Sequence, residues 1–140
     1  MSIDSSGRTD KLEQAVHSKK IQNVCALGPE ARFDYFIRKV VDFEEVWGLY
    51  DEGWATSELQ GSVVIPFWPE EAFAAQCATG EWGGFTPRSI PMQGFLEQWL
   101  PGLHSAAQMC QVFPVPDDVG VVIAPPELEL LVREELQQYE

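Results

Sequence analysis

Apolar residues recur at helical spacing in several parts of the chain. In residues 29–43 they return at intervals of three and four, and Pro29 suits a first helical turn, so the pattern predicts a helix from Pro29 to Phe43. Its polar face, with Arg32, Asp34, Arg38 and Lys39, is expected to be solvated. Similar spacing predicts four further helices: one after a cap at Thr9 or Asp10, one from Pro69 to Gly80, one from Met92 to Pro101-Gly102, and one from Pro125 onward.

Short β-prone runs lie between these helices. Three of them, Val46–Tyr50, Trp54–Thr56 and Val63–Phe67, are separated by glycine-containing links, a pattern that predicts an antiparallel meander. A further strand is expected at Pro87–Ile90. Met109–Val115 and Val119–Ala124 flank a Pro-Asp-Asp turn and predict a second hairpin, in which Pro114 favours an edge position.

The predicted element order is ααβββαβαββα. Strands joined by short hairpins favour an α+β fold over a doubly wound one, so we expect a single two-layer domain over residues 11–140. Its sheet would be antiparallel or mixed, of about five strands, with helices packed on it. Residues 1–10 are polar and predict a disordered tail without the apolar centre of a secretion signal, which favours a cytoplasmic location.

Charge is distributed unevenly along the chain. Residues 1–40 hold seven basic and five acidic residues, whereas residues 41–140 hold two basic and seventeen acidic ones. Such an acidic surface repels phosphate groups, which argues against binding to nucleic acids and anionic membranes. A basic protein is therefore the expected partner if there is one. Solubility alone is the simpler explanation of the acidity.

All five tryptophans lie between Val46 and Trp99, a stretch whose only basic residue is Arg88. Trp47 and Trp99 fall in periodic elements and are expected in the core. Two others lie beside flexible turns: Trp54 follows Asp51-Glu52-Gly53, and Trp82 precedes Gly83-Gly84. These two are either core residues or the anchors of a partner-binding surface, with Asp51, Glu52 and Glu81 as its polar rim.

Chemical signatures of catalysis or metal binding are weak. Cys25, Cys77 and Cys110 are odd in number and widely spaced, which argues against disulfides and zinc and favours buried free thiols. His17 and His104 belong to no metal-ligand motif. A Cys-His nucleophile pairing is conceivable, for example Cys110 with His104, but their spacing does not require them to meet. We therefore predict no metal site, no cofactor and no catalytic residues.

Four segments together resemble the bacterial proteins grouped as domain of unknown function 2750. They are VWGLYDEGWA at residues 46–55, IPFWPEEAFAAQCATGEW at 65–82, SIPMQGFLEQWLPGL at 89–103 and VFPVPDDVGVVIAPPEL at 112–128. The resemblance covers residues 30–136 and implies one cytosolic bacterial domain. It implies no activity and supplies no catalytic residues.

Three functions remain open on the sequence. The leading hypothesis is a non-enzymatic protein–protein interaction module, adaptor-like or immunity-like, that uses an acidic, tryptophan-bearing surface. The alternative is a small-ligand binder or enzyme with an aromatic pocket formed by Trp54, Trp68 and Trp82, in which Glu81 or Glu58 acts as a base. The third is a DNA mimic, which ranks last because the acidic doublets are scattered.

Overall fold

The computed structural model describes residue 15 and residues 17–138 of the chain. The predicted tail and the predicted cap at Thr9 or Asp10 lie outside these residues. A helix runs through residues 17–25, and α2 follows from Pro29 to Phe43, with the bounds that the sequence pattern predicted. The buried face of α2 consists of Phe36, Ile37, Val40 and Val41, joined by one unexpected polar residue, Arg32.

Within the described residues, six strands form two sheets. In the smaller sheet, β1 (Glu45–Tyr50) pairs antiparallel with β4 (Thr86–Pro91). The larger sheet has the order β2-β3-β5-β6, with bounds Ser57–Leu59, Ser62–Phe67, Met109–Val112 and Val121–Ile123. Its central pair, β3 and β5, is parallel, and the two outer pairs are antiparallel. The sheet is therefore mixed, which is one of the two forms that the sequence predicted.

The predicted three-stranded meander is wrong. β2 and β3 do form a hairpin, because Gln60 and Gly61 both take the positive φ angles, +53° and +83°, that a two-residue turn requires. β1, however, pairs with β4 instead of β2, and Trp54 contributes only a single bridge to Tyr50. The chain between β1 and β2 thus crosses from one sheet to the other, and the second strand lies at residues 57–59.

The two sheets are joined at one point. Trp47 in β1 and Trp68, just after β3, exchange two backbone hydrogen bonds of 2.8 Å each. β5 lies between β3 and β6, so the predicted edge position is wrong; Pro114 lies beyond the end of the strand, where its missing N–H leaves the sheet intact.

Of the remaining helices, the last begins at Pro125 as predicted, whereas the others differ from the predicted bounds. These remaining helices are α3 (Glu71–Gln76), η1 (Gly80–Trp82), α4 (Met92–Gly94), η2 (Phe95–Trp99), α5 (Leu100–Ser105) and α6 (Pro125–Gln137). Gly80 does not cap α3, which ends at Gln76, but opens the 3-10 turn η1 with a φ of +59°. The helix at Met92 passes through Pro101-Gly102, because the π-helical segment η2 directly before α5 leaves Pro101 in a first helical turn, where no N–H is needed.

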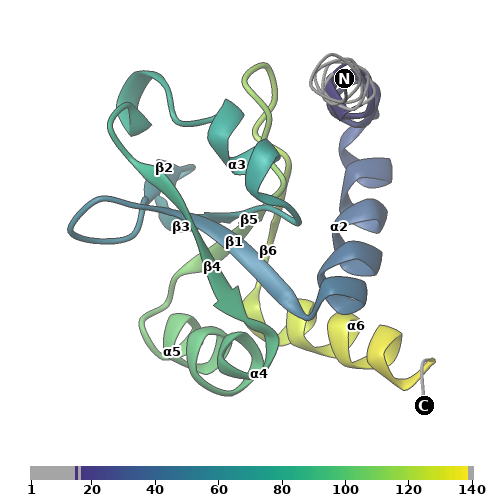
Figure 1. Ribbon diagram of the computed structural model, residues 1–140. Helices are drawn as coiled ribbons and strands as arrows, with labels where there is room; N and C mark the ends of the chain where they lie inside the picture. The colour runs from purple at the N-terminus through teal and green to yellow at the C-terminus, as the bar shows by residue number, and fades with distance from the viewer. Residues whose placement is uncertain (1–14, 16, 139–140) are drawn as a thin grey trace, which may run out of the picture.

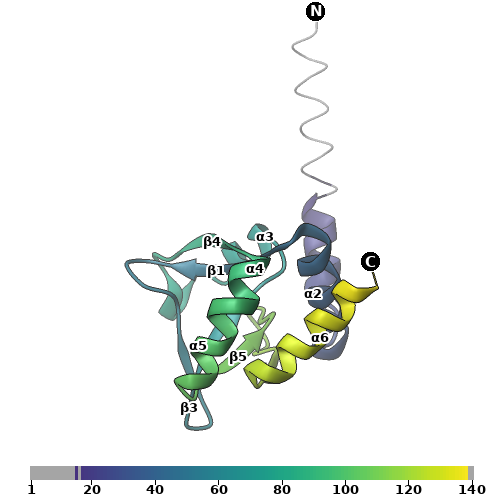
Figure 2. The same cartoon turned by 90° about the horizontal axis from the view of Figure 1, so that it is seen from below.

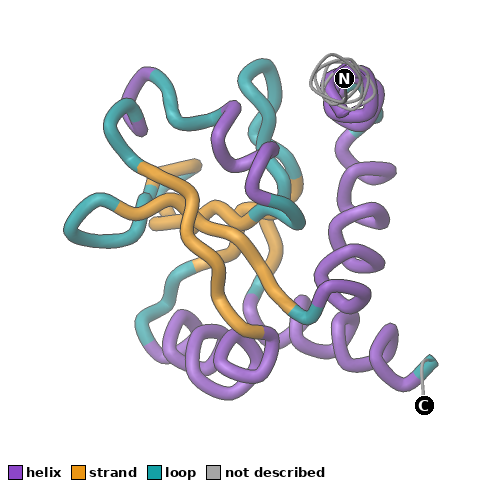
Figure 3. The backbone as a smooth tube through the Cα atoms, in the orientation of Figure 1, coloured by secondary structure: helices purple, strands orange, loops and turns teal. Residues whose placement is uncertain are grey.

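The predicted α+β class and element order are confirmed, with two linked sheets in place of one. In Figure 1, α2 and α6 lie on one side of the strands, and α4 and α5 lie at one end. Figure 2 shows α5 and α6 side by side, in agreement with their direct contacts. Figure 3 shows the strands at the centre of the molecule, with helices and loops around them. None of the helices in the part of the chain that the structure describes is long and apolar enough to cross a membrane.

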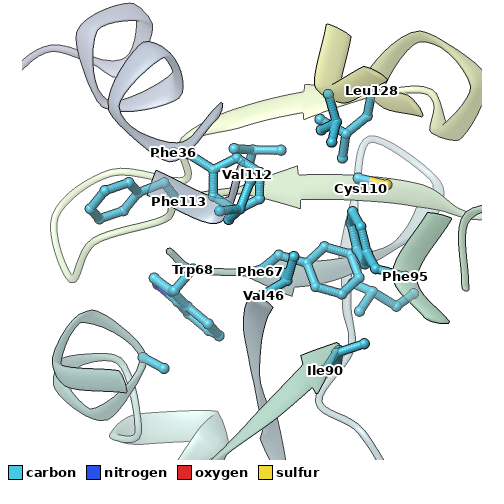
Figure 4. Close-up of a cluster of buried hydrophobic side chains, with 14 of the residues drawn as sticks. Phe36, Val46, Phe67, Trp68, Ile90, Phe95, Cys110, Val112, Phe113 and Leu128 are labelled. Carbon is cyan, nitrogen blue, oxygen red and sulfur yellow. The ribbon is translucent and has the colours of Figure 1, made fainter. Parts of the chain in front are cut away.

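A single hydrophobic core unites these elements. Phe67 and Trp68 of the β3 segment, Phe95 of η2 and Leu128 of α6 have no exposed surface, and Figure 4 shows their side chains converging between the strands and helices. Each such aromatic side chain removes about 150–250 Å² from water, so these residues account for much of the stability of the fold. Trp47 and Trp99 pack against this core and are partly buried.

Candidate functional site

The five residues predicted to bind a partner lie in two different places. Asp51 and Glu52 are exposed in the turn after β1, and Trp54 packs close by against the aromatic residues of that region. Glu81 and Trp82 lie in η1 and line a pocket to which the other three do not contribute. Both tryptophans are partly buried and pack on the core, so neither is wholly enclosed.

Trp54 belongs to an aromatic cluster capped by a cation. Its ring meets those of Tyr50 and Trp99 edge-on, at centroid distances of 5.1 and 4.7 Å. The guanidinium of Arg88 lies 4.4 Å from the centroid of Tyr50 and 5.8 Å from that of Trp54. A Cβ at Gly48 would approach the Trp54 ring to 3.0 Å, which explains the glycine in the middle of β1. Arg88 thus supplies a positive charge beside the acidic turn.

Trp82 has a different environment. Its indole Nε1 donates a hydrogen bond of 3.1 Å to the carbonyl oxygen of Thr56, and its ring meets the buried ring of Trp68 edge-on at 5.9 Å. These contacts fix the orientation of the indole at one wall of an open pocket of about 500 Å³, which we call the Trp82 pocket. Its lining consists of Ser57, Leu59, Cys77, Thr79, Glu81, Trp82, Gln111 and the loop Pro114–Val119. The volume lies within the range of small-ligand sites.

The floor of the Trp82 pocket is one face of the larger sheet. Ser57 pairs with Val64, and Gln111 pairs with Pro66, two residues further along β3. Because side chains alternate along a strand, Ser57 and Gln111 point to the same face. The opposite face carries Cys110 and Val112, which are buried in the core.

The loop that closes the pocket is held by Arg32, which is only 2% exposed. The guanidinium forms an ion pair with Asp118 and donates hydrogen bonds to the carbonyl oxygens of Leu27 (2.5 Å) and Phe113 (3.3 Å). The prediction that Arg32 lies on a solvated stripe is therefore wrong. Arg32 lies one turn before Phe36 and therefore on the same, buried face of α2. Its guanidinium finds acceptors in Leu27 before the helix, in Phe113 just after β5 and in Asp118 of the loop.

Backbone geometry also shapes this loop. Phe113 has a φ of +55°, which ends β5 and turns the chain so that the carbonyl oxygen of Pro114 accepts hydrogen bonds from Trp68 Nε1 (2.8 Å) and Cys77 Sγ (3.4 Å). Gly120 has a φ of +78°, and a Cβ there would lie 2.4 Å from the carbonyl oxygen of Val112. Glycine is required at this position. These contacts define the path of the loop that forms one wall of the pocket.

Gln111 is the least satisfied polar group of the site. Gln111 is 4% exposed, and its Nε2 donates a hydrogen bond of 3.0 Å to the carbonyl oxygen of Val119. Its Oε1 is buried and has no hydrogen-bond partner within the described residues. A buried acceptor without a donor costs about 1–3 kcal/mol, so the unpaired Oε1 is unfavourable for the folded protein.

The thiols of the protein are unsuited to nucleophilic chemistry. Burial raises the pKa of Cys77 to about 11 and that of Cys110 to about 12, and burial also raises the pKa of Cys25. At neutral pH all three are therefore protonated. Cys110 has no exposed surface, whereas His104 is exposed in the last turn of α5, so they do not form the dyad considered above. Across residues 17–138 and residue 15, no group of three His, Cys, Asp or Glu side chains can hold a metal ion.

Sequence reasoning missed Gln111, Arg32 and the loop as parts of one site. The Asp117-Asp118 doublet was interpreted as a turn tip, and the two residues do form one, since Val115 and Asp118 bridge across it. No sequence signal links this turn to η1, because the two are brought together only by the parallel pairing of β3 and β5.

Fold and site together define a small mixed α+β protein with an acidic pocket that has an indole at its wall. The chain belongs to the family of proteins of unknown function DUF2750, whose model matches residues 33–131. Every residue that lines the Trp82 pocket lies within this match, while Arg32 directly precedes it. No curated protein shows significant similarity to the chain.

Proposed function

We propose that the protein is a non-enzymatic interaction module, adaptor-like or immunity-like, that binds a basic region of another protein with the acidic surface around Trp82. The charge distribution supports this, because residues 41–140 hold seventeen acidic and two basic side chains. Such a surface speeds the encounter with a positively charged partner. A cytoplasmic location accompanies the proposal and is supported by the three free cysteines.

The observation that carries the proposal is the composition of the Trp82 pocket. A partly buried indole lies next to Glu81, and Asp117 of the loop also lines the pocket. Asp118 is neutralised by Arg32, whereas Glu81 and Asp117 form no ion pair with any residue that the structure describes. An aromatic anchor with unpaired carboxylates around it is typical of a site for a cationic side chain.

A small-ligand binder remains the second candidate, and the pocket volume of about 500 Å³ favours it. The predicted aromatic pocket of three tryptophans is replaced by one with a single tryptophan at its wall, because Trp68 is fully buried and Trp54 packs elsewhere. Glu58 does not line this pocket, so Glu81 is the one carboxylate of the original pair that lies there.

Affinity capture from a native lysate at low and high salt tests the protein-binding proposal. The bait is compared with a Glu81→Gln/Asp117→Asn variant and with a control, Glu134→Gln/Glu135→Gln, that loses the same two charges on α6. We expect the wild type and the control to retain basic proteins at low salt, and we expect the pocket variant to lose them. If every captured protein binds all three baits equally, the acidic pocket is not the recognition surface.

A further inference from the structure

The unpaired oxygen of Gln111 identifies the kind of ligand that the Trp82 pocket accepts. Gln111 Nε2 is held by the carbonyl oxygen of Val119, so the amide cannot flip without losing this hydrogen bond. Its Oε1 is therefore fixed as an acceptor on the pocket side of the sheet, and no described group donates to it. A ligand that satisfies this oxygen must bring a hydrogen-bond donor.

Charge and apolar surface narrow the ligand further. The rim carboxylates of Glu81 and Asp117 favour a positive charge, and the indole of Trp82 offers a surface over which a cation is stabilised. Leu59 and Val119 add apolar lining, and Val119 is 51% exposed. The pocket thus combines an apolar passage, an acidic rim and an acceptor on its floor.

We propose that the Trp82 pocket binds the cationic N–H end of an aliphatic chain, an ammonium or guanidinium group, with Gln111 Oε1 accepting a hydrogen bond from it. This inference rests on the proposed function and names its ligand chemistry. The source is a lysine or arginine side chain of the partner or a free aliphatic amine. The oxygen is buried, so a donor reaches it only when neighbouring groups shift, and side-chain rotamer changes of this kind are common on binding.

Small probes test the site without any partner protein. ¹H–¹⁵N NMR spectra of the full-length chain are recorded with n-butylammonium, with ethylguanidinium, and with the neutral n-butanol as control. We expect the two cations to shift the Gln111 side-chain amide and the Trp82 indole N–H together, and n-butanol to leave both in place. A lysine-containing peptide and free butylammonium are then compared, and the tighter of the two identifies the source.

Variants of Gln111 and Glu81 distinguish the contribution of the pocket floor to binding from that of the pocket rim. Gln111→Met keeps the length of the side chain and removes the acceptor, and we expect it to weaken cation binding about tenfold or more, since a hydrogen bond to a charged group is lost. Glu81→Gln changes an exposed residue, so this variant should fold even if Gln111→Met does not. We expect it to weaken binding of the two cations and to leave the response to n-butanol unchanged. Glu134→Gln on α6 should bind as the wild type does.

Several outcomes overturn the inference. It fails if the Gln111 amide is unmoved by every probe, which would mean that water satisfies the oxygen, or if butanol shifts it as much as the cations do. It also fails if Glu81→Gln and Glu134→Gln weaken binding equally. Failure of lysate capture with intact probe binding would refute the proposed partner, whereas capture without probe binding would refute the ligand chemistry.

Discussion

Replacing Arg32 by methionine should destabilise the protein by about 3 kcal/mol. Removing one partner of a buried ion pair costs about 3–5 kcal/mol when the other charge stays buried. The side chain of Asp118 is 40% exposed, so water solvates its carboxylate once Arg32 is gone. This lowers the cost of the lost ion pair to about 1 kcal/mol. The carbonyl oxygens of Leu27 and Phe113 also lose their charged donor, at about 1 kcal/mol each. Methionine keeps most of the apolar contact.

Urea unfolding followed by tryptophan fluorescence measures this cost. Arg38→Met is the matched control, because Arg38 lies on the same helix and is exposed, and it should change the unfolding free energy by less than about 0.5 kcal/mol. Asp118→Asn should cost less than Arg32→Met, since the guanidinium keeps its two carbonyl partners. A loss below about 1 kcal/mol for Arg32→Met, or one equal to that of Arg38→Met, would refute the idea that Arg32 fixes the loop.

Three further predictions concern the same region. Gly120→Ala should cost about 3 kcal/mol or more in thermal unfolding, because its Cβ would lie 2.4 Å from a backbone oxygen at a φ of +78°. Trp68→Phe should cost about 2–3 kcal/mol in the same assay, since a 2.8 Å hydrogen bond and buried volume are lost. Cys77 and Cys110 should resist alkylation at pH 8 until the protein unfolds, because burial raises their pKa values from 9.0 to about 11 and 12, and stability should decline only as pH rises above about 9.

Each of these three predictions has a control variant or a result that would contradict it. Gly102→Ala adds a Cβ with no atom within 4 Å and should leave the protein at least as stable, so equal losses at Gly102 and Gly120 would contradict the steric argument. For the thiols, rapid alkylation of either buried cysteine in the native protein would mean that the core opens more readily than its packing implies. A Trp68→Phe variant as stable as wild type would show that the indole hydrogen bond contributes nothing.

The elements of the fold could largely be predicted from the sequence, whereas their pairing could not. The spacing of apolar residues located α2 to the residue and β1, β3 and β4 to within one residue. The partner of β1 was missed, because hairpin signals report only local contacts and β4 lies far along the chain. Likewise, the π-helical turn that lets the helix continue past Pro101 has no recognisable pattern.

The candidate site could be predicted only in part, for the same reason. Trp82 and Glu81 were identified by their local chemistry, and they do lie together at a pocket. Gln111 offered no signal, since a single glutamine in a strand is ordinary and its unpaired oxygen exists only in the folded protein. Arg32 was assigned to the solvated face, although its spacing of four from Phe36 places it on the buried face of α2. Its partner Asp118 lies 86 residues further along the chain, so no local pattern reveals the ion pair.

The strands that end each sheet bear on how the protein behaves when concentrated. β2 and β6, the outer strands of the larger sheet, have three residues each, which gives a neighbouring molecule few backbone groups to bind. β4 is longer and is paired on one side alone, yet it contains Pro87 and Pro91, which lack an N–H, and the exposed Arg88. Such features hinder strand addition between molecules. These three strands therefore offer few backbone groups for strand addition between molecules, despite the many aromatic residues of the chain.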